Sequence, residues 1–278
     1  MLRLALAASA AVLTLASLPA QAADSKLNAA VASADRGAEN KARDSARKPA
    51  ATLGFWGLKA KQTVIEISPG GGYWTEILAP YAKATGGTYV AGVTDVDNPR
   101  TSEGAKKSLE TFKARYADPA KYGVVKYAGF GVVSKPLGAP NSADLVFTSR
   151  NIHNFTYMPG LLDKAMGDFF AVLKPGGVLG VEEHRADPRP EVPGITDGYV
   201  SVATVVKAAE KAGFKLAASS ELNANPKDTK DHPFGVWTLP PVKRSAPGGQ
   251  PANPAFDRSK YDAIGESDRM TLRFVKPR

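Results

Sequence analysis

The sequence predicts an α/β fold of the Rossmann-like kind, in which helices cover both faces of a mostly parallel sheet. Three observations carry this prediction. Between residues 63 and 222, short β-branched runs alternate with longer amphipathic or charged segments, as strands and helices do in βαβ units. The run Thr63–Ile67 is followed closely by three glycines and then by an amphipathic segment. Turn signals such as Lys174-Pro175-Gly176-Gly177 separate the later runs.

Glycine and proline set most boundaries of the expected elements. Gly86-Gly87 precedes the second strand, Pro175-Gly176 follows a helix, and Gly213 suits the C′ position of a later helix. The expected strands are 63–67, 88–93, 124–127, 144–148, 178–182, 214–222 and 270–275, and the expected helices are 73–82, 102–116, 160–173 and 199–212.

The first 22 residues have the pattern of a cleavable signal peptide. Arg3 gives a positive start, Leu4 to Leu18 is almost entirely apolar, and Ala20-Gln21-Ala22 is a small-x-small cleavage site. The apolar run is shorter than the roughly 20 residues of a membrane-spanning helix. An uncleaved N-terminal anchor is the alternative. We therefore expect a periplasmic or secreted protein with no membrane span after signal removal.

The rest of the chain divides into two regions. Residues 23–52 form a helical or partly disordered lead-in, rich in Ala, Lys, Arg and Asp. In it, the run 43–49 is either a lid over a ligand or a solvated helix with local ion pairs. Residues 53–278 form a single domain, in which the prolines and glycines of 240–256 predict a surface excursion.

Composition excludes several kinds of site. The 278 residues include no cysteine, so the chain has no disulfide, thiolate nucleophile or cysteine metal site. The formal charge is +9, but charges of both signs are interleaved along 24–48 and 100–126. We therefore interpret the excess of basic residues as part of a solvated surface, and we expect no nucleic-acid partner. No feature of the sequence predicts an oligomeric state.

Gly70, Gly71 and Gly72 mark a candidate cofactor loop. Glycine has no Cβ and tolerates positive φ, so the chain can turn tightly and a ligand can approach the backbone. The helix that follows offers unpaired N–H groups. The dinucleotide fingerprint Gly-x-Gly-x-x-Gly is matched at its first two positions, but Thr75 occupies the third, and this reading stays open as an alternative. A phosphate loop is excluded because no Gly-Lys-Ser/Thr follows.

The pattern around this loop resembles the first motif of class I S-adenosylmethionine-dependent methyltransferases, Asp/Glu-x-Gly-x-Gly-x-Gly. Glu66, Gly70 and Gly72 match it, with Ser68 at the first glycine position. The segments 173–179 and 211–214 are similar to the family's turns into its fifth and sixth strands.

A narrower resemblance is to a group of exported methyltransferases known only by prediction. Their pattern of Arg-Lys-Pro, Pro-Gly-Gly-Gly-x-x-Thr-Glu-Ile-Leu and Arg-Asn-x-His-Asn is found at 47–49, 69–78 and 150–154. The resemblance spans about residues 43–278.

The resemblance implies a seven-stranded sheet with an antiparallel last strand, S-adenosylmethionine as cofactor, and a small or medium-sized methyl acceptor. It implies that Glu66 supports the loop and the amino-acid end of the cofactor, or only caps its own loop. Asp95 or Asp97 would accept from the ribose hydroxyls, unless Asp95 forms only a local turn. The implied cofactor-binding residues are Glu66, Ser68, Gly70, Gly71, Gly72, Asp95 and Asn151.

Two departures from the family pattern support a second hypothesis. Ser68 replaces the first loop glycine, and Gly129-Phe130 stand where the family has a carboxylate after its third strand. S-adenosylmethionine is also made in the cytoplasm, away from an exported protein. The chain is therefore either a methyltransferase or an exported, non-catalytic binding protein whose cofactor is lost or altered.

Two of the three histidines, His153 and His184, follow neighbouring strands at the edge where the acceptor is expected. Because imidazole is the commonest proton acceptor near neutral pH, they are the candidate catalytic residues, His153 being favoured. Asn151, Asn154 and Arg150 are candidate substrate or cofactor contacts. The alternatives are a structural imidazole or a metal site that includes Glu183. Because no motif fixes ligand geometry, we expect no metal.

Overall fold

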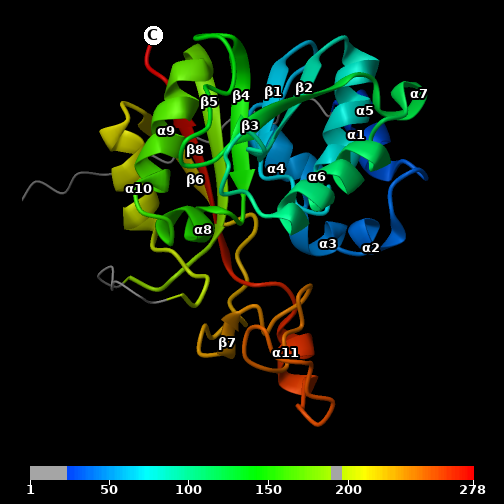
Figure 1. Cartoon of the computed structure of the whole chain (residues 1–278), viewed down its shortest axis with the longest axis vertical. Helices are drawn as coiled ribbons and strands as arrows, with labels where there is room; N and C mark the ends of the chain where they lie inside the picture. Colours follow the sequence, from blue (N-terminus) through cyan, green and yellow to red (C-terminus); the bar gives the residue numbers. More distant parts are fainter. Residues whose placement is uncertain (1–23, 189–195) are drawn as a thin grey trace, which may run out of the picture.

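The computed structural model describes residues 24–188 and 196–278, so the signal peptide expected at 1–22 lies outside the described residues. Seven strands form one sheet in the order β3-β2-β1-β4-β5-β8-β6 (Figure 1). β1 to β5 pair in parallel, and β8 lies antiparallel between β5 and β6. The strands are β1 (Thr63–Ile67), β2 (Thr88–Thr94), β3 (Val125–Phe130), β4 (Ala143–Ser149), β5 (Leu173–His184), β6 (Lys215–Ser220) and β8 (Arg269–Val275).

This topology confirms the predicted fold class. The antiparallel β8 also distinguishes the sheet from dinucleotide-binding folds, whose strand order is 3-2-1-4-5-6 without such an insertion. The dinucleotide alternative is therefore not supported by the connectivity.

Helices lie on both faces of the sheet, because successive residues of its buried strands point in opposite directions. In β1, Ile65 packs in the core with α9 and α10, whereas Val64 packs in the core with α4 and α5. The helices are α1 (Ser25–Ala32), α2 (Ala38–Lys41), α3 (Asp44–Arg47), α4 (Pro49–Phe55), α5 (Thr75–Thr85), α6 (Glu103–Arg115), α7 (Pro119–Tyr122), α8 (Ile152–Thr156), α9 (Leu161–Val172), α10 (Val202–Lys211) and α11 (Ser259–Ile264). No helix of the described residues is long and apolar enough to cross a membrane.

The lead-in contributes α1 to α4 and is joined to the sheet by Trp56, which follows α4. The Trp56 side chain is fully buried, and its ring stacks on Phe147 of β4 with the centroids 5.2 Å apart. Its indole N–H donates to the carbonyl oxygen of Leu272 in β8 at 3.0 Å. A Cβ added to Gly180 of β5 would lie 2.5 Å from the Trp56 ring, so glycine is needed there for this close approach.

Several boundaries differ from the prediction, among them the following three. β3 continues to Phe130, not 127, so the Gly129-Phe130 pair lies inside the strand. β5 begins at Leu173, not 178, because Leu173 pairs with Ala143 across a register shift, despite the turn composition that follows it. The helix expected from 199 begins only at Val202, since the preceding residues run extended beside β5.

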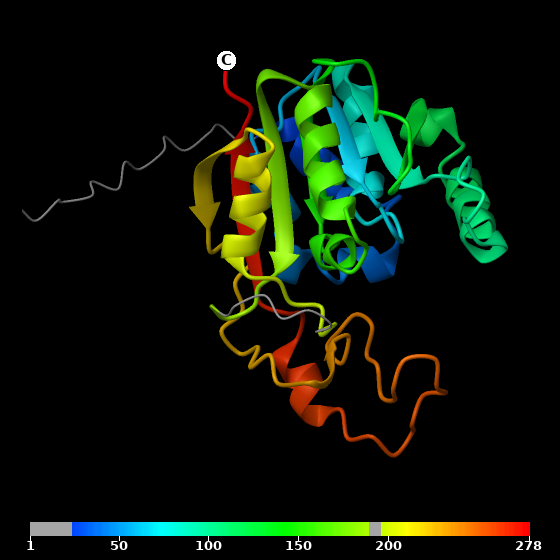
Figure 2. The ribbon, with the colours of Figure 1, turned by 60° about the vertical axis from the view of Figure 1, so that its left-hand side comes forward.

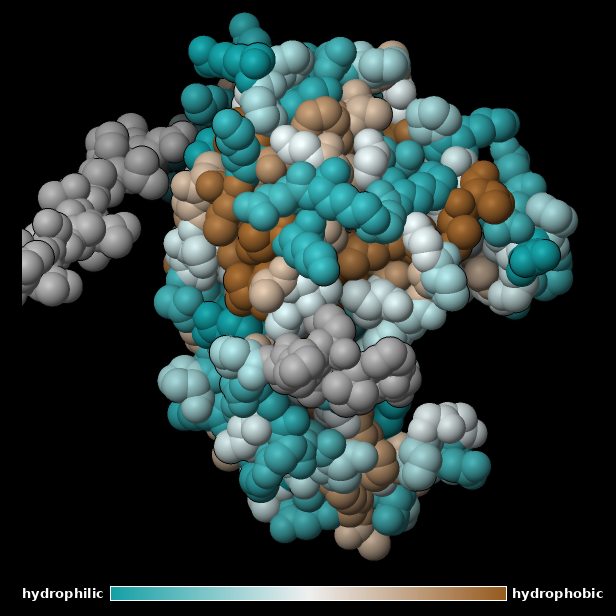
Figure 3. Space-filling model, turned by 90° about the vertical axis from the view of Figure 1, so that its left-hand side faces the viewer, coloured by the Kyte–Doolittle hydropathy of each residue, from teal (hydrophilic) through white to brown (hydrophobic). Residues whose placement is uncertain are grey.

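An insertion between β6 and β8, residues 221–268, forms what we call the cap lobe, which includes β7 (Pro233–Val236) and α11. It lies beyond the carboxyl ends of the parallel strands (Figures 1 and 2). In the space-filling view the cap lobe projects below the sheet domain and leaves a notch beside it (Figure 3). The expected excursion at 240–256 belongs to this lobe. The cap lobe therefore lies at the edge of the sheet where α/β proteins bind their ligands.

Candidate functional site

The loop between β1 and α5 adopts a left-handed backbone at three positions. φ is +55° at Ser68, +56° at Gly70 and +83° at Gly72. The Ser68 N–H donates to the carbonyl oxygen of Gly92 in β2 at 2.8 Å, which fixes the start of the loop. A left-handed residue with a side chain costs roughly 1–2 kcal/mol, which explains why the family pattern has glycine at the Ser68 position.

Two cavities flank this loop, with volumes of about 580 Å³ and about 390 Å³. They share Ser68, Pro69, Gly70 and Asn151 as lining residues. A Cβ added to Gly70 would meet no atom within 4 Å, so this glycine faces open space. Volumes in this range are typical of sites for small molecules and cofactors.

Gly72 has a different role from the one predicted. It lines neither cavity, and a Cβ added there would lie 1.8 Å from the Tyr116 hydroxyl oxygen. This glycine therefore allows Tyr116 to pack against the loop, whereas Gly70 and Gly71 border the larger cavity.

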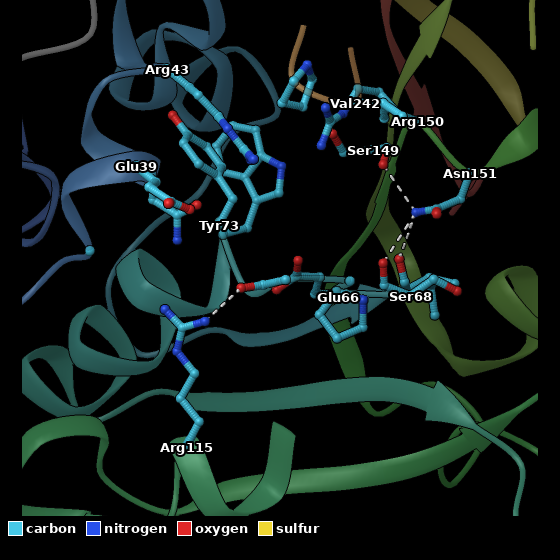
Figure 4. Close-up of a pocket in the computed structure, with 18 of the residues that line it drawn as sticks. Glu39, Arg43, Glu66, Ser68, Tyr73, Arg115, Ser149, Arg150, Asn151 and Val242 are labelled. Carbon is cyan, nitrogen blue, oxygen red and sulfur yellow. Dashed lines mark hydrogen bonds between the residues drawn. The ribbon is translucent and has the colours of Figure 1, made fainter. Parts of the chain in front are cut away.

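Glu66 lies buried beneath the loop and lines the larger cavity (Figure 4). Its Oε2 accepts hydrogen bonds from the hydroxyls of Tyr89 at 2.5 Å and Thr75 at 3.2 Å. Burial raises the pKa of Glu66 to about 7, against the opposing effect of these two hydroxyls. Within the part of the chain that the structure describes, nothing donates to Oε1.

The two cavities differ in the chemistry of their linings. The larger one offers Glu66 Oε1 to an ammonium group. The smaller one is lined by apolar side chains, including Leu109 and Phe112 of α6, which suit an adenine ring. Gly70 stands between them, where the ligand would cross bare backbone.

We predict that cofactor affinity depends on the ionisation of Glu66. A cationic amino group binds the carboxylate and not the neutral acid, so S-adenosylhomocysteine should bind about tenfold more tightly at pH 8 than at pH 6. Calorimetric titration at the two pH values measures this ratio.

Glu66→Gln is the control for the titration of the ligand itself. The variant should bind more weakly and with a smaller pH ratio than the wild type. The stability of the free protein provides a second readout. A carboxyl whose pKa is raised on folding stabilises the protein below its unfolded pKa and loses this contribution as pH rises through 7. If the ratio of S-adenosylhomocysteine affinity at pH 8 to that at pH 6 were equal in the wild type and in Glu66→Gln, the proposed role of Glu66 would be contradicted.

An ion pair that we did not predict fixes the loop from outside. Arg115, at the end of α6, donates to the carbonyl oxygen of Gly71 at 3.2 Å and pairs with Glu76 of α5 at 2.5 Å. Glu76 also accepts from the backbone N–H of Gly37, at the start of α2, at 3.0 Å. The pair therefore links three segments around the larger cavity, which no local sequence signal reveals.

Asn151 ties the end of β4 to the loop. Its side-chain amide donates to the carbonyl oxygens of Ile67 at 3.2 Å, Ser68 at 3.3 Å and Ser149 at 3.0 Å (Figure 4). It also lines both cavities. The sequence-predicted residues Glu66, Ser68, Gly70, Gly71 and Asn151 are thus brought together around one space.

Asp95 lies outside this group. Its carboxylate accepts from the backbone N–H of Asp97 at 3.1 Å, which is the local turn that we weighed as an alternative. It lines neither cavity, whereas its neighbour Thr94 lines the smaller one. The ribose role of Asp95 stays a prediction.

His153 and His184 form a second cluster with Glu183, and none of the three lines either cavity. His153 is buried; its Nδ1 lies 2.9 Å from Glu183 Oε1, and its backbone N–H donates to Oε2 at 3.2 Å. His184 Nδ1 lies 2.5 Å from the Ser267 hydroxyl. Burial, and then the charges of His153 and Arg150, lower the pKa of His184 well below its usual value, so this imidazole is neutral.

The three side chains also meet the spacing of the metal alternative. One ligand atom from each lies within 4.8 Å of the others. However, both Glu183 oxygens already accept hydrogen bonds from N–H groups of His153 and His184. An ion would have to replace these contacts, so we interpret the cluster as an imidazole oriented by a carboxylate.

No family model and no curated protein sequence matches the chain, but many solved structures share its fold. The [4+2]-cyclase SpnF superimposes with a TM-score of 0.54 at 15% identity, covering 84% of this chain and 82% of its own. The geranyl diphosphate C-methyltransferase of Streptomyces coelicolor A3(2) gives 0.53 at 12%, covering 89% and 87%. A geranyl diphosphate methyltransferase solved with SAM gives 0.53 at 10%, covering 90% and 94%. The chain has the class I methyltransferase fold.

Similarities at this level of identity establish the fold alone. A cyclase stands beside two methyltransferases among these structures, so the fold does not decide the reaction. The functional argument therefore depends on the residues of the site.

Proposed function

We propose that the chain is an exported S-adenosylmethionine-dependent methyltransferase acting on a small or medium-sized acceptor. The observation that carries the proposal is the pair of cavities separated by the side-chain-free Gly70, with Glu66 on one side and apolar α6 side chains on the other. This arrangement suits a ligand with an ammonium at one end and an aromatic base at the other. The first-motif resemblance of residues 66–72 supports the same cofactor.

When bound, S-adenosylmethionine supplies a methyl group on a sulfonium, whose transfer to an acceptor lone pair leaves a neutral thioether. The protein's main task is to hold the acceptor in line at near-attack distance. The loop and Asn151 form a rigid wall for this purpose, because both are fixed by backbone hydrogen bonds. A base is needed only where the acceptor must also lose a proton.

His153 is the residue that we propose as this base. If Nδ1 donates its proton to Glu183, then Nε2 is left as the acceptor nitrogen, so the buried carboxylate sets the tautomer and orients the ring. Within the described residues, nothing donates to Nε2. Glu183 thus acts as a positioning residue, which sequence reasoning had considered only as a metal ligand.

Binding and transfer can be tested without knowing the acceptor. The purified protein should bind both S-adenosylmethionine and S-adenosylhomocysteine in calorimetric titration. It should also transfer radiolabelled methyl groups to compounds in a small-molecule extract of its source. Indifference to both ligands would overturn the proposal and leave the non-catalytic binding protein. The protein should be found outside the cytoplasm on cell fractionation, with residue 23 at its N-terminus.

The proposed base makes a separate prediction. His153→Gln should lower the transfer rate at least tenfold with cofactor affinity nearly unchanged, since general-base contributions are roughly 10²–10⁴-fold. His232→Gln is the matched control, because His232 pairs with Asp228 inside the cap lobe. If His232→Gln lost methyl transfer and His153→Gln kept it, the assignment of His153 as the base would be contradicted.

A further inference from the structure

Arginines gather on one side of the larger cavity. Arg43 and Arg150 line it, and in Figure 4 they lie across the pocket from Glu66 and Ser68. Arg47 stacks over the ring of Tyr73, another lining residue, with its guanidinium carbon 4.5 Å from the ring centroid. Arg115 lines the cavity on the loop side but pairs with Glu76, and Glu39 lines it near Arg43. Arg43 and Arg150 are thus the arginines that face the cavity opposite the loop.

Most of the donors of these arginines have no partner. Arg47 is fully buried and its Nε donates to Glu266, but Nη1 and Nη2 find no acceptor in the described parts of the chain. Among residues 24–188 and 196–278, none accepts a hydrogen bond from the Arg150 guanidinium, whose Nε is buried. The same holds for the side chain of Arg43 within these ranges. Such groups are costly to bury unless something accepts from them.

The charges around these arginines are also unbalanced. Glu266 is the carboxylate nearest to Arg47; burial would raise its pKa, but Arg47, Arg269 and Arg150 lower it to about 2. Arg269 also forms an ion pair with Glu266, so this carboxylate is shared between Arg47 and Arg269. Burial, and then Arg47, lower the pKa of Arg150 to about 10, although Glu266 and Glu182 act in the opposite direction. Neither carboxylate accepts a hydrogen bond from the Arg150 guanidinium among the described residues. An anion from outside would complete the site.

We infer that the methyl acceptor carries an oxyanion, a carboxylate or a phosphate, which is bound by Arg150 together with Arg43, the two arginines that line this side of the cavity. This inference rests on the proposed function. The cofactor is a poor source of the missing charge, because its one carboxylate accompanies an ammonium and a sulfonium. Guanidinium groups bind carboxylate and phosphate oxygens through paired hydrogen bonds, which both fixes the acceptor's orientation and selects its class.

The experiment titrates the purified protein with inorganic phosphate and, separately, with succinate, each with and without saturating S-adenosylhomocysteine. We expect one of the two anions to bind both with and without S-adenosylhomocysteine. Which of them binds shows whether the site prefers a tetrahedral phosphate or a planar carboxylate. Arg150→Gln should weaken that binding roughly tenfold or more, since a charged hydrogen bond contributes 1.5–3 kcal/mol. Its affinity for S-adenosylhomocysteine should stay within about threefold of the wild type.

The matched control is Arg100→Gln, which removes the same charge from an exposed position outside this cavity and should leave anion binding unchanged. Arg150→Gln should melt at a higher temperature than the wild type, because it removes a poorly paired, largely buried cation. Arg43→Gln gives an independent second variant.

Three results would overturn the inference: no anion binding, binding that neither Arg150→Gln nor Arg43→Gln weakens, or displacement of the anion by S-adenosylhomocysteine. The last would assign the arginines to the cofactor's own carboxylate. If the anion binds through Arg150 but S-adenosylhomocysteine does not bind at all, then the proposed function fails, and with it the description of this anion as a methyl acceptor.

Discussion

Gly70→Val is expected to weaken the binding of S-adenosylhomocysteine roughly 1,000-fold or more, a loss of about 4 kcal/mol, while the protein stays folded. A side chain at this position meets no protein atom within 4 Å, so it projects into the space between the two cavities that the ligand would cross. The cost to the fold is the strain of a β-branched residue at a φ of +56°, roughly 1–2 kcal/mol. Calorimetric titration and thermal unfolding measure the two effects separately.

Gly86→Val is the matched control for backbone strain. Gly86 also has a positive φ, +72°, and an added Cβ there meets nothing within 4 Å. It is the C-cap of α5, at the opposite end of this helix from the loop. This variant should show a similar loss of stability and unchanged affinity. Equal affinity in Gly70→Val and the wild type would refute the placement of the ligand.

Trp56→Ala is expected to lower the free energy of unfolding by about 3–5 kcal/mol, the range found when large aromatic side chains are removed from cores. The indole is fully buried between Phe147 of β4 and Gly180 of β5, and its ring centroid lies 6.1 Å from that of Trp74, the N-cap residue of α5. Its loss would leave a cavity beneath the cofactor loop. Urea denaturation measures the change.

Trp56→Phe separates packing from hydrogen bonding. The phenyl ring keeps most of the contact with Phe147 but cannot donate to the carbonyl of Leu272, so a loss of about 1–3 kcal/mol is expected. An unfolding free energy in Trp56→Ala equal to that of the wild type would show that α1 to α4 are not integral to the domain.

The order and type of most elements could be predicted because the signals are local. The β-branched run 63–67 and the amphipathic segment after the glycines are each shorter than 12 residues, and their periodicity decides strand or helix. The start of β5 could not be predicted in this way. Its first residues look like a turn, and the strand begins at Leu173 because these residues pair with β4 and with residue 276 beyond β8.

The candidate site could be predicted in part. Glu66, Gly70 and Asn151 were found because the carboxyl ends of neighbouring parallel strands meet at one edge of the sheet. Arg150 was predicted as a substrate or cofactor contact and the run 43–49 as a possible lid. The burial of Arg47 and its ion pair could not be predicted, because that pair joins distant parts of the chain. Arg47 and Glu266 are 219 residues apart. No window of sequence contains such a contact, and the composition of the cap lobe gave no sign of it.

The central claim is that the space on both sides of Gly70 holds an adenosyl ligand, and a crystal structure with S-adenosylhomocysteine tests it most directly. The account predicts the amino group of the ligand at Glu66, its ribose over Gly70, and its base against Leu109 and Phe112. Ligand density elsewhere, or its absence from crystals grown at saturating ligand, would contradict the account.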